Sequence, residues 1–232
     1  MNYIITIFTC ICLLCAISSA EAGITALEWN NRGIAHFGQG NYDEAIAAYH
    51  NATMIEPKNA MVWGNIGLAL ATQGKYEESF VALNKSTHFN PDDSLVWSNM
   101  GLVLNHLKRY DEAIFAFDQS LKINPASART ITNKGLTYHL LGREEDALAA
   151  YERATSVDPD YGSAWRNKGS ALLTLGKNHE AITACDMAIR IQAEDAGAYE
   201  IKSDALEKIG DTQGSREAAE KSDAIKKNTS EK

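Results

Sequence analysis

The chain carries a pattern of small, aromatic and apolar residues that returns every 34 positions. Glycine keeps this step at Gly33, Gly67, Gly101, Gly135 and Gly169. Tryptophan keeps it at Trp29, Trp63, Trp97 and Trp165, with Ile131 in the fourth slot, and proline keeps it at Pro57, Pro91, Pro125 and Pro159. No insertion breaks the frame between residue 26 and about residue 195. A fixed period of this length indicates a repeat architecture in which each repeat is one supersecondary unit.

Each period contains two segments with helical spacing. In the first segment Trp29, Arg32, Gly33 and His36 follow helical spacing, and the second segment follows the same spacing from Ala45 to Ala52. A turn between the segments has glycine at Gly40, Gly74, Gly142, Gly176 and Gly210, and Lys108 takes this slot once. Because proline disfavours helix at the residue before it, the repeated proline ends the second segment. Each period therefore predicts two antiparallel helices of about 14 residues.

The residue sizes in three slots predict how these helices pack. The slots of Gly33 and Ala45 hold only small residues, so helices can approach closely there, whereas the slot of Tyr49 holds mostly large ones. A helix pair of this kind cannot bury its apolar face alone, so neighbouring repeats must stack. We therefore expect a leucine at Gly101 to overpack the array, at a cost of about 1–3 kcal/mol or more.

The same residues resemble the tetratricopeptide repeat (TPR) family, whose pattern is W-x-x-L-G-x-x-Y, then a small residue, an aromatic and a closing proline. The resemblance implies an all-α fold, a right-handed superhelical solenoid of antiparallel helix pairs. Between residues 26 and 195, five repeats are expected at residues 26–59, 60–93, 94–127, 128–161 and 162–195. A degenerate sixth repeat follows at residues 196–229, where Tyr199 takes the tryptophan slot and the last helix is much more polar. Such a helix suits a C-terminal cap whose outer face meets water, and residues 230–232 form a tail.

The first 22 residues have the pattern of an export signal. Residues 4–20 carry no charged side chain, and small residues separated by one position follow, Ser18 with Ala20 or Ala20 with Ala22. This pattern predicts a cleaved signal peptide. Because no Lys or Arg precedes the apolar stretch, an uncleaved N-terminal anchor stays open as the alternative. We therefore expect an extracytoplasmic protein, secreted or membrane-tethered, and a cytoplasmic one if residues 1–22 are not a signal.

The charge balance and the reactive residues argue against two classes of function. Lys and Arg total 22 against 30 Asp and Glu, which gives a net charge of −8, whereas a large nucleic-acid interface needs clustered cations. The 6 histidines form no zinc-binding pair, and no phosphate-binding loop or nucleophile elbow is present. Cys185 stands in the slot of Tyr49, so it is interpreted as a packing residue. We expect no catalytic, cofactor or metal site.

One polar slot recurs on the helices that, by the resemblance, line a concave groove. It holds Asn31, Asn65, Asn99, Asn133 and Asn167, each two residues before the repeat glycine. A side-chain amide offers both donors and an acceptor, so this column could hold the backbone of an extended chain whatever its sequence. The alternative is ordinary repeat chemistry, because asparagine is common in this slot across the family.

A column of basic residues lies beside the asparagines. Arg32, Lys134, Lys168 and Lys202 follow the asparagine slot directly, and Arg129 and Arg166 are close by in the sequence. One interpretation is a basic strip in the groove that attracts an acidic partner. The other is that long stems cover apolar surface while the charged heads stay in water.

These features predict a non-enzymatic scaffold that binds a peptide or protein segment in the concave groove of a TPR superhelix. The fold by itself does not name the ligand. The alternative is a structural, self-associating component of a cell-envelope assembly. We expect no nucleic-acid partner, and membrane contact only through an uncleaved N-terminal segment.

Overall fold

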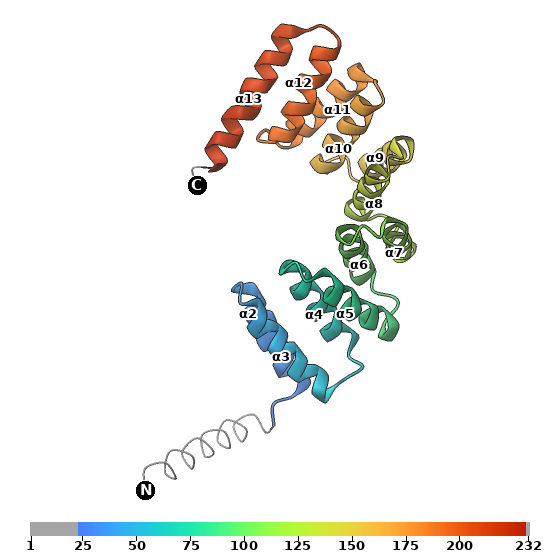
Figure 1. Ribbon diagram of the computed structural model, residues 1–232, viewed down its shortest axis with the longest axis vertical. Helices are drawn as coiled ribbons and strands as arrows, with labels where there is room; N and C mark the ends of the chain where they lie inside the picture. The colour runs from blue at the N-terminus through green and yellow to red at the C-terminus, as the bar shows by residue number, and fades with distance from the viewer. Residues whose placement is uncertain (1–22, 231–232) are drawn as a thin grey trace. The chain divides into compact units, whose positions relative to one another are not determined.

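The computed structural model describes residues 23–230, and the predicted signal at residues 1–22 lies outside the described residues (Figure 1). The described chain consists of α-helices and contains no strand, so the predicted all-α repeat fold is confirmed. Its helices divide between two compact units, which separate in the sequence between Pro91 and Asp92.

The two units are built from the same kind of helix pair. Unit 1 contains α2 (Ala26–Gly38), α3 (Tyr42–Ile55), α4 (Ala60–Thr72) and α5 (Tyr76–Phe89). Unit 2 contains α6 (Ser94–His106), α7 (Tyr110–Ile123), α8 (Ala128–Leu140), α9 (Glu144–Val157), α10 (Gly162–Thr174), α11 (Asn178–Ile191), α12 (Ala196–Lys208) and α13 (Thr212–Ser230). A first helix of 13 residues packs against the second helix of 14 residues that follows it, and only the last second helix, α13, is longer, with 19 residues. Within residues 23–230, no helix combines the length and the apolar character needed to cross a membrane.

Side-chain caps begin most of the first helices. Thr25 and Glu28 form a capping box at α2, and Asn59, Asp93 and Ser127 accept backbone N–H groups at α4, α6 and α8. Each cap satisfies a donor that the first turn of a helix leaves without a partner. Local sequence therefore fixes where these helices start.

The turn inside each pair needs one residue with a left-handed backbone. Glycine supplies it at Gly40, Gly74, Gly142, Gly176 and Gly210, with φ values of 79°, 76°, 70°, 72° and 85°. Lys108 adopts a φ of 59° at the equivalent turn between α6 and α7. Glycine is the default here because it has no Cβ to oppose positive φ. The predicted turn slot is confirmed, including its one exception.

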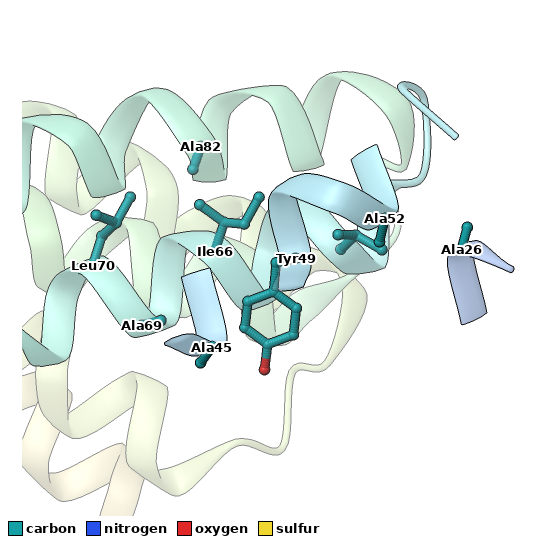
Figure 2. Packing of buried hydrophobic residues seen from close by; sticks show 9 residues of the cluster. Ala26, Ala45, Tyr49, Ala52, Ile66, Ala69, Leu70 and Ala82 are labelled. Carbon is teal, nitrogen blue, oxygen red and sulfur yellow. The ribbon is translucent and has the colours of Figure 1, made fainter. Parts of the chain in front are cut away.

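The repeat glycine lies where the second helix of its pair leaves no room for a side chain. A Cβ added to Gly101 would lie 2.6 Å from the Phe117 ring, which is fully buried. Figure 2 shows the equivalent ring of unit 1, Tyr49, in one core cluster with the small Ala45 and with Ile66. The predicted pairing of a small slot with a large one is therefore confirmed, and the large residue belongs to the same helix pair as the glycine.

Candidate peptide-binding face

The asparagine slot lies on the first helix of five pairs, α2, α4, α6, α8 and α10. Asn31 is exposed, and the asparagines at the other four positions are half-buried. In unit 1, Nδ2 of Asn65 donates a hydrogen bond to Oδ1 of the buried Asn30, 2.9 Å away on α2. This bond orients the Asn65 amide and leaves its Oδ1 to accept a hydrogen bond from a ligand.

The asparagines of unit 2 keep their amides uncommitted. Asn99, Asn133 and Asn167 make no side-chain hydrogen bond with any residue that the structure describes. Each amide therefore has two donors and one acceptor oxygen for an outside partner. A half-buried amide that the chain itself does not use is the kind of group that a ligand satisfies on binding.

Two more residues of each first helix share a face with its asparagine, because residues four before and three after it fall on one side of a helix. We call these three positions of each first helix the asparagine face. It consists of Leu27, Asn31 and Ile34 on α2; Met61, Asn65 and Leu68 on α4; Leu95, Asn99 and Leu102 on α6; Arg129, Asn133 and Leu136 on α8; and Ser163, Asn167 and Ser170 on α10. Apart from Arg129, the flanking residues are missing from the site predicted by sequence. Their spacing from the asparagine slot is the signal that finds them.

The flanking residues are apolar and exposed on several first helices. The exposed fractions are 61% for Leu27, 50% for Ile34, 52% for Met61, 40% for Leu68, 58% for Leu95 and 38% for Leu136. On α10, serines take both flanking positions. The same helical geometry therefore presents an apolar face on α2, α4 and α6 and a polar one on α10.

The lysines of the predicted basic strip lie in ion pairs with the second helix of the preceding pair. Nζ of Lys134 lies 2.6 Å from Asp118 and Nζ of Lys168 lies 3.6 Å from Glu152, and Lys202 repeats the arrangement on α12. Burial acts to lower the pKa of Lys134, but the hydrogen bond and the charge of Asp118 outweigh it and raise the pKa. These cations are neutralised within the chain. The contacts favour the interpretation in which lysine stems cover apolar surface.

The two arginines of the predicted site have different surroundings. Nη1 of Arg166 donates to both carboxylate oxygens of Asp195, at 3.2 Å each. Asp195 is only 5% exposed and also accepts the backbone N–H of Ala198 as the N-cap of α12. Arg166 therefore holds the start of α12. Arg129 is exposed on the asparagine face of α8 and forms no ion pair among residues 23–230.

Cys185 does not provide a reactive thiol. It is fully buried in α11, and burial, reinforced by the charges of Asp186 and Asp195, raises its pKa to about 12. A thiol with this pKa stays protonated near neutral pH and is a poor nucleophile. Among the described residues, no group of three or more His, Cys, Asp or Glu side chains is placed to hold a metal ion.

A hollow of about 740 Å³ lies between α11, α12 and α13 and includes no residue of the asparagine face. Ile182, Tyr199 and Leu206 form the apolar part of its lining, and lysine and carboxylate side chains form most of the remainder. None of the buried polar atoms that lack a partner in the described chain lies in it. Its volume is typical of ligand pockets, but it contains no buried polar group without a partner that would indicate a ligand.

Sequence comparison assigns the repeats to a family. Family models described as tetratricopeptide repeat match residues 26–59, 61–93, 92–160 and 141–198. The chain belongs to the tetratricopeptide repeat family. These TPR matches together extend from residue 26 to residue 198, which includes every asparagine of the asparagine face. A comparison with curated proteins found no match.

Solved TPR structures share the fold of this chain. PilW, described as a widely conserved type IV pilus biogenesis factor, is 18% identical with a TM-score of 0.74, over 83% of this chain and 90% of PilW. MamA from Desulfovibrio magneticus RS-1 is 20% identical with a TM-score of 0.68, over 75% and 98% of the two chains. YrrB, described as a TPR protein with an unusual peptide-binding site, is 19% identical with a TM-score of 0.64, over 79% and 95%. Identities this low show a common fold and carry no information about a common ligand.

Proposed function

We propose that this TPR protein is a non-enzymatic scaffold that binds an extended peptide or protein segment through the asparagine face. The observation that carries the proposal is one asparagine, exposed or half-buried, repeated on five first helices. Four of these amides make no side-chain hydrogen bond with a described residue, and the fifth, Asn65, keeps its acceptor oxygen. Within each unit, unused polar groups repeated on neighbouring first helices suit a ligand whose own polar groups are regular, and a peptide backbone is such a ligand.

The spacing of the row fits an extended chain. Packed helices lie about 8–10 Å apart, and an extended chain rises about 3.3 Å per residue. Within one unit, asparagines on neighbouring first helices would therefore meet the ligand backbone about every third residue. Because an amide can donate to a C=O and accept from an N–H, each asparagine can bind the backbone without reading the side chains. Asn31 and Asn65 supply such contacts in unit 1, and Asn99, Asn133 and Asn167 supply them in unit 2.

The charged residues contribute less to this binding than a basic strip would. Lys134, Lys168 and Arg166 each have a carboxylate partner within the chain. Arg129 alone among these adds an uncompensated positive charge to the asparagine face. The proposal therefore rests on amide and apolar contacts, and YrrB, with its described peptide-binding site, is a TPR protein in which peptide binding occurs.

The proposal is tested by capture of a partner from envelope and secreted fractions with residues 23–232 as bait. The triple variant, with alanine at Asn65, Asn99 and Asn133, loses three contacts with the ligand backbone. We therefore expect its affinity for the captured partner to fall by about 100-fold. Asn84→Ala, an exposed asparagine on the second helix α5, is the matched control and should capture as wild type does. Circular dichroism of each variant shows whether it is folded. Equal capture by the wild type and the triple variant would move the site to another face.

Self-association is the second candidate, and apolar side chains on second helices support it. Met54 is 82% exposed on α3, Val81 is 55% exposed on α5 and Phe115 is 58% exposed on α7. Exposed apolar groups of this kind are typical of protein contact sites when they gather in a patch. Capture of further copies of this chain alone, with a mass that rises with concentration, would favour a structural assembly role.

We infer that the protein acts outside the cytoplasm and that residues 1–22 direct its export. The inference rests on the uncharged stretch at residues 4–20, and an envelope setting agrees with the pilus-related description of PilW. Mass spectrometry of the protein from its native source is expected to show a chain that lacks about the first 22 residues. An unshortened chain in the cytoplasmic fraction would contradict export and favour the cytoplasmic alternative.

A further inference from the structure

The asparagine face of unit 1 has four large apolar side chains that are exposed. Leu27 and Ile34 flank Asn31 on α2 and are 61% and 50% exposed. Met61 and Leu68 flank Asn65 on α4 and are 52% and 40% exposed. The Asn65–Asn30 hydrogen bond ties these two helices together, so both sets of residues belong to one surface. This surface has two apolar rows, Leu27 with Met61 and Ile34 with Leu68, with an asparagine row between them.

The surface carries few formal charges. Residues 60–74, which contain α4, include no Asp, Glu, Lys or Arg. On α2 the only such residues are Glu28 and Arg32, and both are engaged locally. Glu28 completes the capping box with Thr25, and the Arg32 guanidinium lies 4.8 Å from the Trp29 ring centre. A charged ligand group placed against the leucine, isoleucine and methionine side chains of the two rows would lose water to apolar surface, which is unfavourable.

The apolar rows are not a requirement of the repeat fold. On α10, in unit 2, Ser163 and Ser170 flank Asn167 at the equivalent positions, and the helix has the same length of 13 residues. On α8 the flanking positions hold Arg129 and Leu136. Since the fold accepts serine and arginine there, the repeat itself does not require apolar residues at these positions.

The geometry of an extended chain explains why both rows are apolar. Backbone N–H and C=O groups lie in the plane of a strand, and successive side chains point to opposite sides of that plane. If the backbone of a ligand lies along the asparagine row, its side chains alternate between the Leu27–Met61 row and the Ile34–Leu68 row. The two rows are seven residues apart on each helix, about 10 Å, which leaves room for a backbone between them.

We propose that the asparagine face of unit 1 selects an uncharged segment of a partner protein in which about four consecutive side chains are apolar. This inference rests on the proposed function and specifies its ligand. Asn31 and Asn65 hold the backbone of the segment, and the two apolar rows cover its alternating side chains. Selection against charge comes from the cost of desolvating a charged side chain against the two apolar rows.

The test measures binding of defined peptides to the full chain by fluorescence anisotropy. The apolar probe is fluorescein-labelled Ser-Gly-Ser-Leu-Val-Leu-Val-Ser-Gly-Ser, and the charged probe replaces both leucines with glutamate. We expect the apolar probe to bind at least about tenfold more tightly than the charged one, since two buried apolar side chains are exchanged for unpaired charges. Equal binding of the two probes, or no binding of the apolar probe, would overturn the inference.

Variants locate the binding on the surface. Leu27→Ser combined with Leu68→Ser, which removes one side chain from each row, is expected to weaken binding of the apolar probe by about tenfold or more. Val81→Ser, at a side chain 55% exposed on α5 outside the asparagine face, is the matched control and should bind as wild type does. Wild-type affinity in the double variant would overturn the inference.

Two further outcomes separate this inference from the proposed function. If asparagine substitutions weaken capture of the native partner but the peptides bind without regard to charge, the proposed function stands and the apolar selection is wrong. If sedimentation shows a wild-type dimer that Leu27→Ser with Leu68→Ser converts to a monomer, and the apolar probe does not bind, a second copy of the chain occupies the surface and the inference is overturned.

Discussion

Replacing Gly101 with leucine is expected to lower the free energy of unfolding by about 3 kcal/mol or more, at the upper end of the usual range for overpacking. The Cβ alone would lie 2.6, 2.7 and 2.8 Å from three atoms of the Phe117 ring. That ring is fully buried, so it has no free space to move into. The helices α6 and α7 must separate to admit the side chain, and the contacts between them are lost. Urea denaturation followed by circular dichroism at 222 nm measures the change.

A second glycine provides the control for Gly101. Gly38 also lies in a helix, at the end of α2, and nothing lies within 4 Å of a Cβ added there. Gly38→Leu is expected to change the unfolding free energy little or to raise it, because leucine has the better helix propensity by about 0.8 kcal/mol. A Gly101→Leu protein as stable as the wild type would show that the assigned contact between α6 and α7 is wrong.

Replacing Asp195 with alanine is expected to destabilise the protein by about 2–3 kcal/mol. The carboxylate caps α12 through the N–H of Ala198, and loss of such a cap typically costs about 1 kcal/mol. It also accepts two charge-assisted hydrogen bonds from Arg166, which add about 1–2 kcal/mol because the arginine side chain is 37% exposed and partly screened. Urea denaturation measures this change as well. The control is Asp204→Ala, at an exposed residue of α12, and its unfolding free energy is expected to stay within about 0.5 kcal/mol of wild type.

The Asp195 prediction also decides the role of Arg166. If the arginine serves the fold, Arg166→Ala destabilises the protein, and the double variant is less destabilised than the sum of the two single changes, by about 1 kcal/mol. If Arg166→Ala leaves stability unchanged but abolishes capture of a partner, Arg166 binds the ligand directly. The structural assignment of Arg166 would then be wrong.

The fold was predictable because its determinants are local and repeated. Gly101 and Phe117 are 16 residues apart, and their small and large slots recur with the 34-residue period, so the close contact of each pair is visible in the sequence. The turns were predictable for the same reason, since a left-handed backbone favours glycine, and Lys108 was recognised as the exception from its place in the period.

The candidate site was predictable only in part. The asparagine slot is regular, so sequence finds it, but its exposure and the Asn65–Asn30 bond depend on how α2 and α4 pack. The flanking apolar residues were missed because leucine and methionine on a helix are usually core residues. Only the structure shows that Leu27 and Met61 are more than half exposed.

The sequence by itself determined the repeat, its helix pairs, their caps and turns, and the slots at which helices touch, because each depends on residues close together in the chain. Tertiary structure decided which charges are free. From the sequence, Lys134 and Lys168 are candidates for a basic strip. In the structure, the packing of neighbouring helix pairs places Asp118 and Glu152 beside them. Ion pairing and burial depend on the distance between side chains from different helices, and one-dimensional spacing does not contain that distance. The apolar rows beside the asparagines became visible for the same reason.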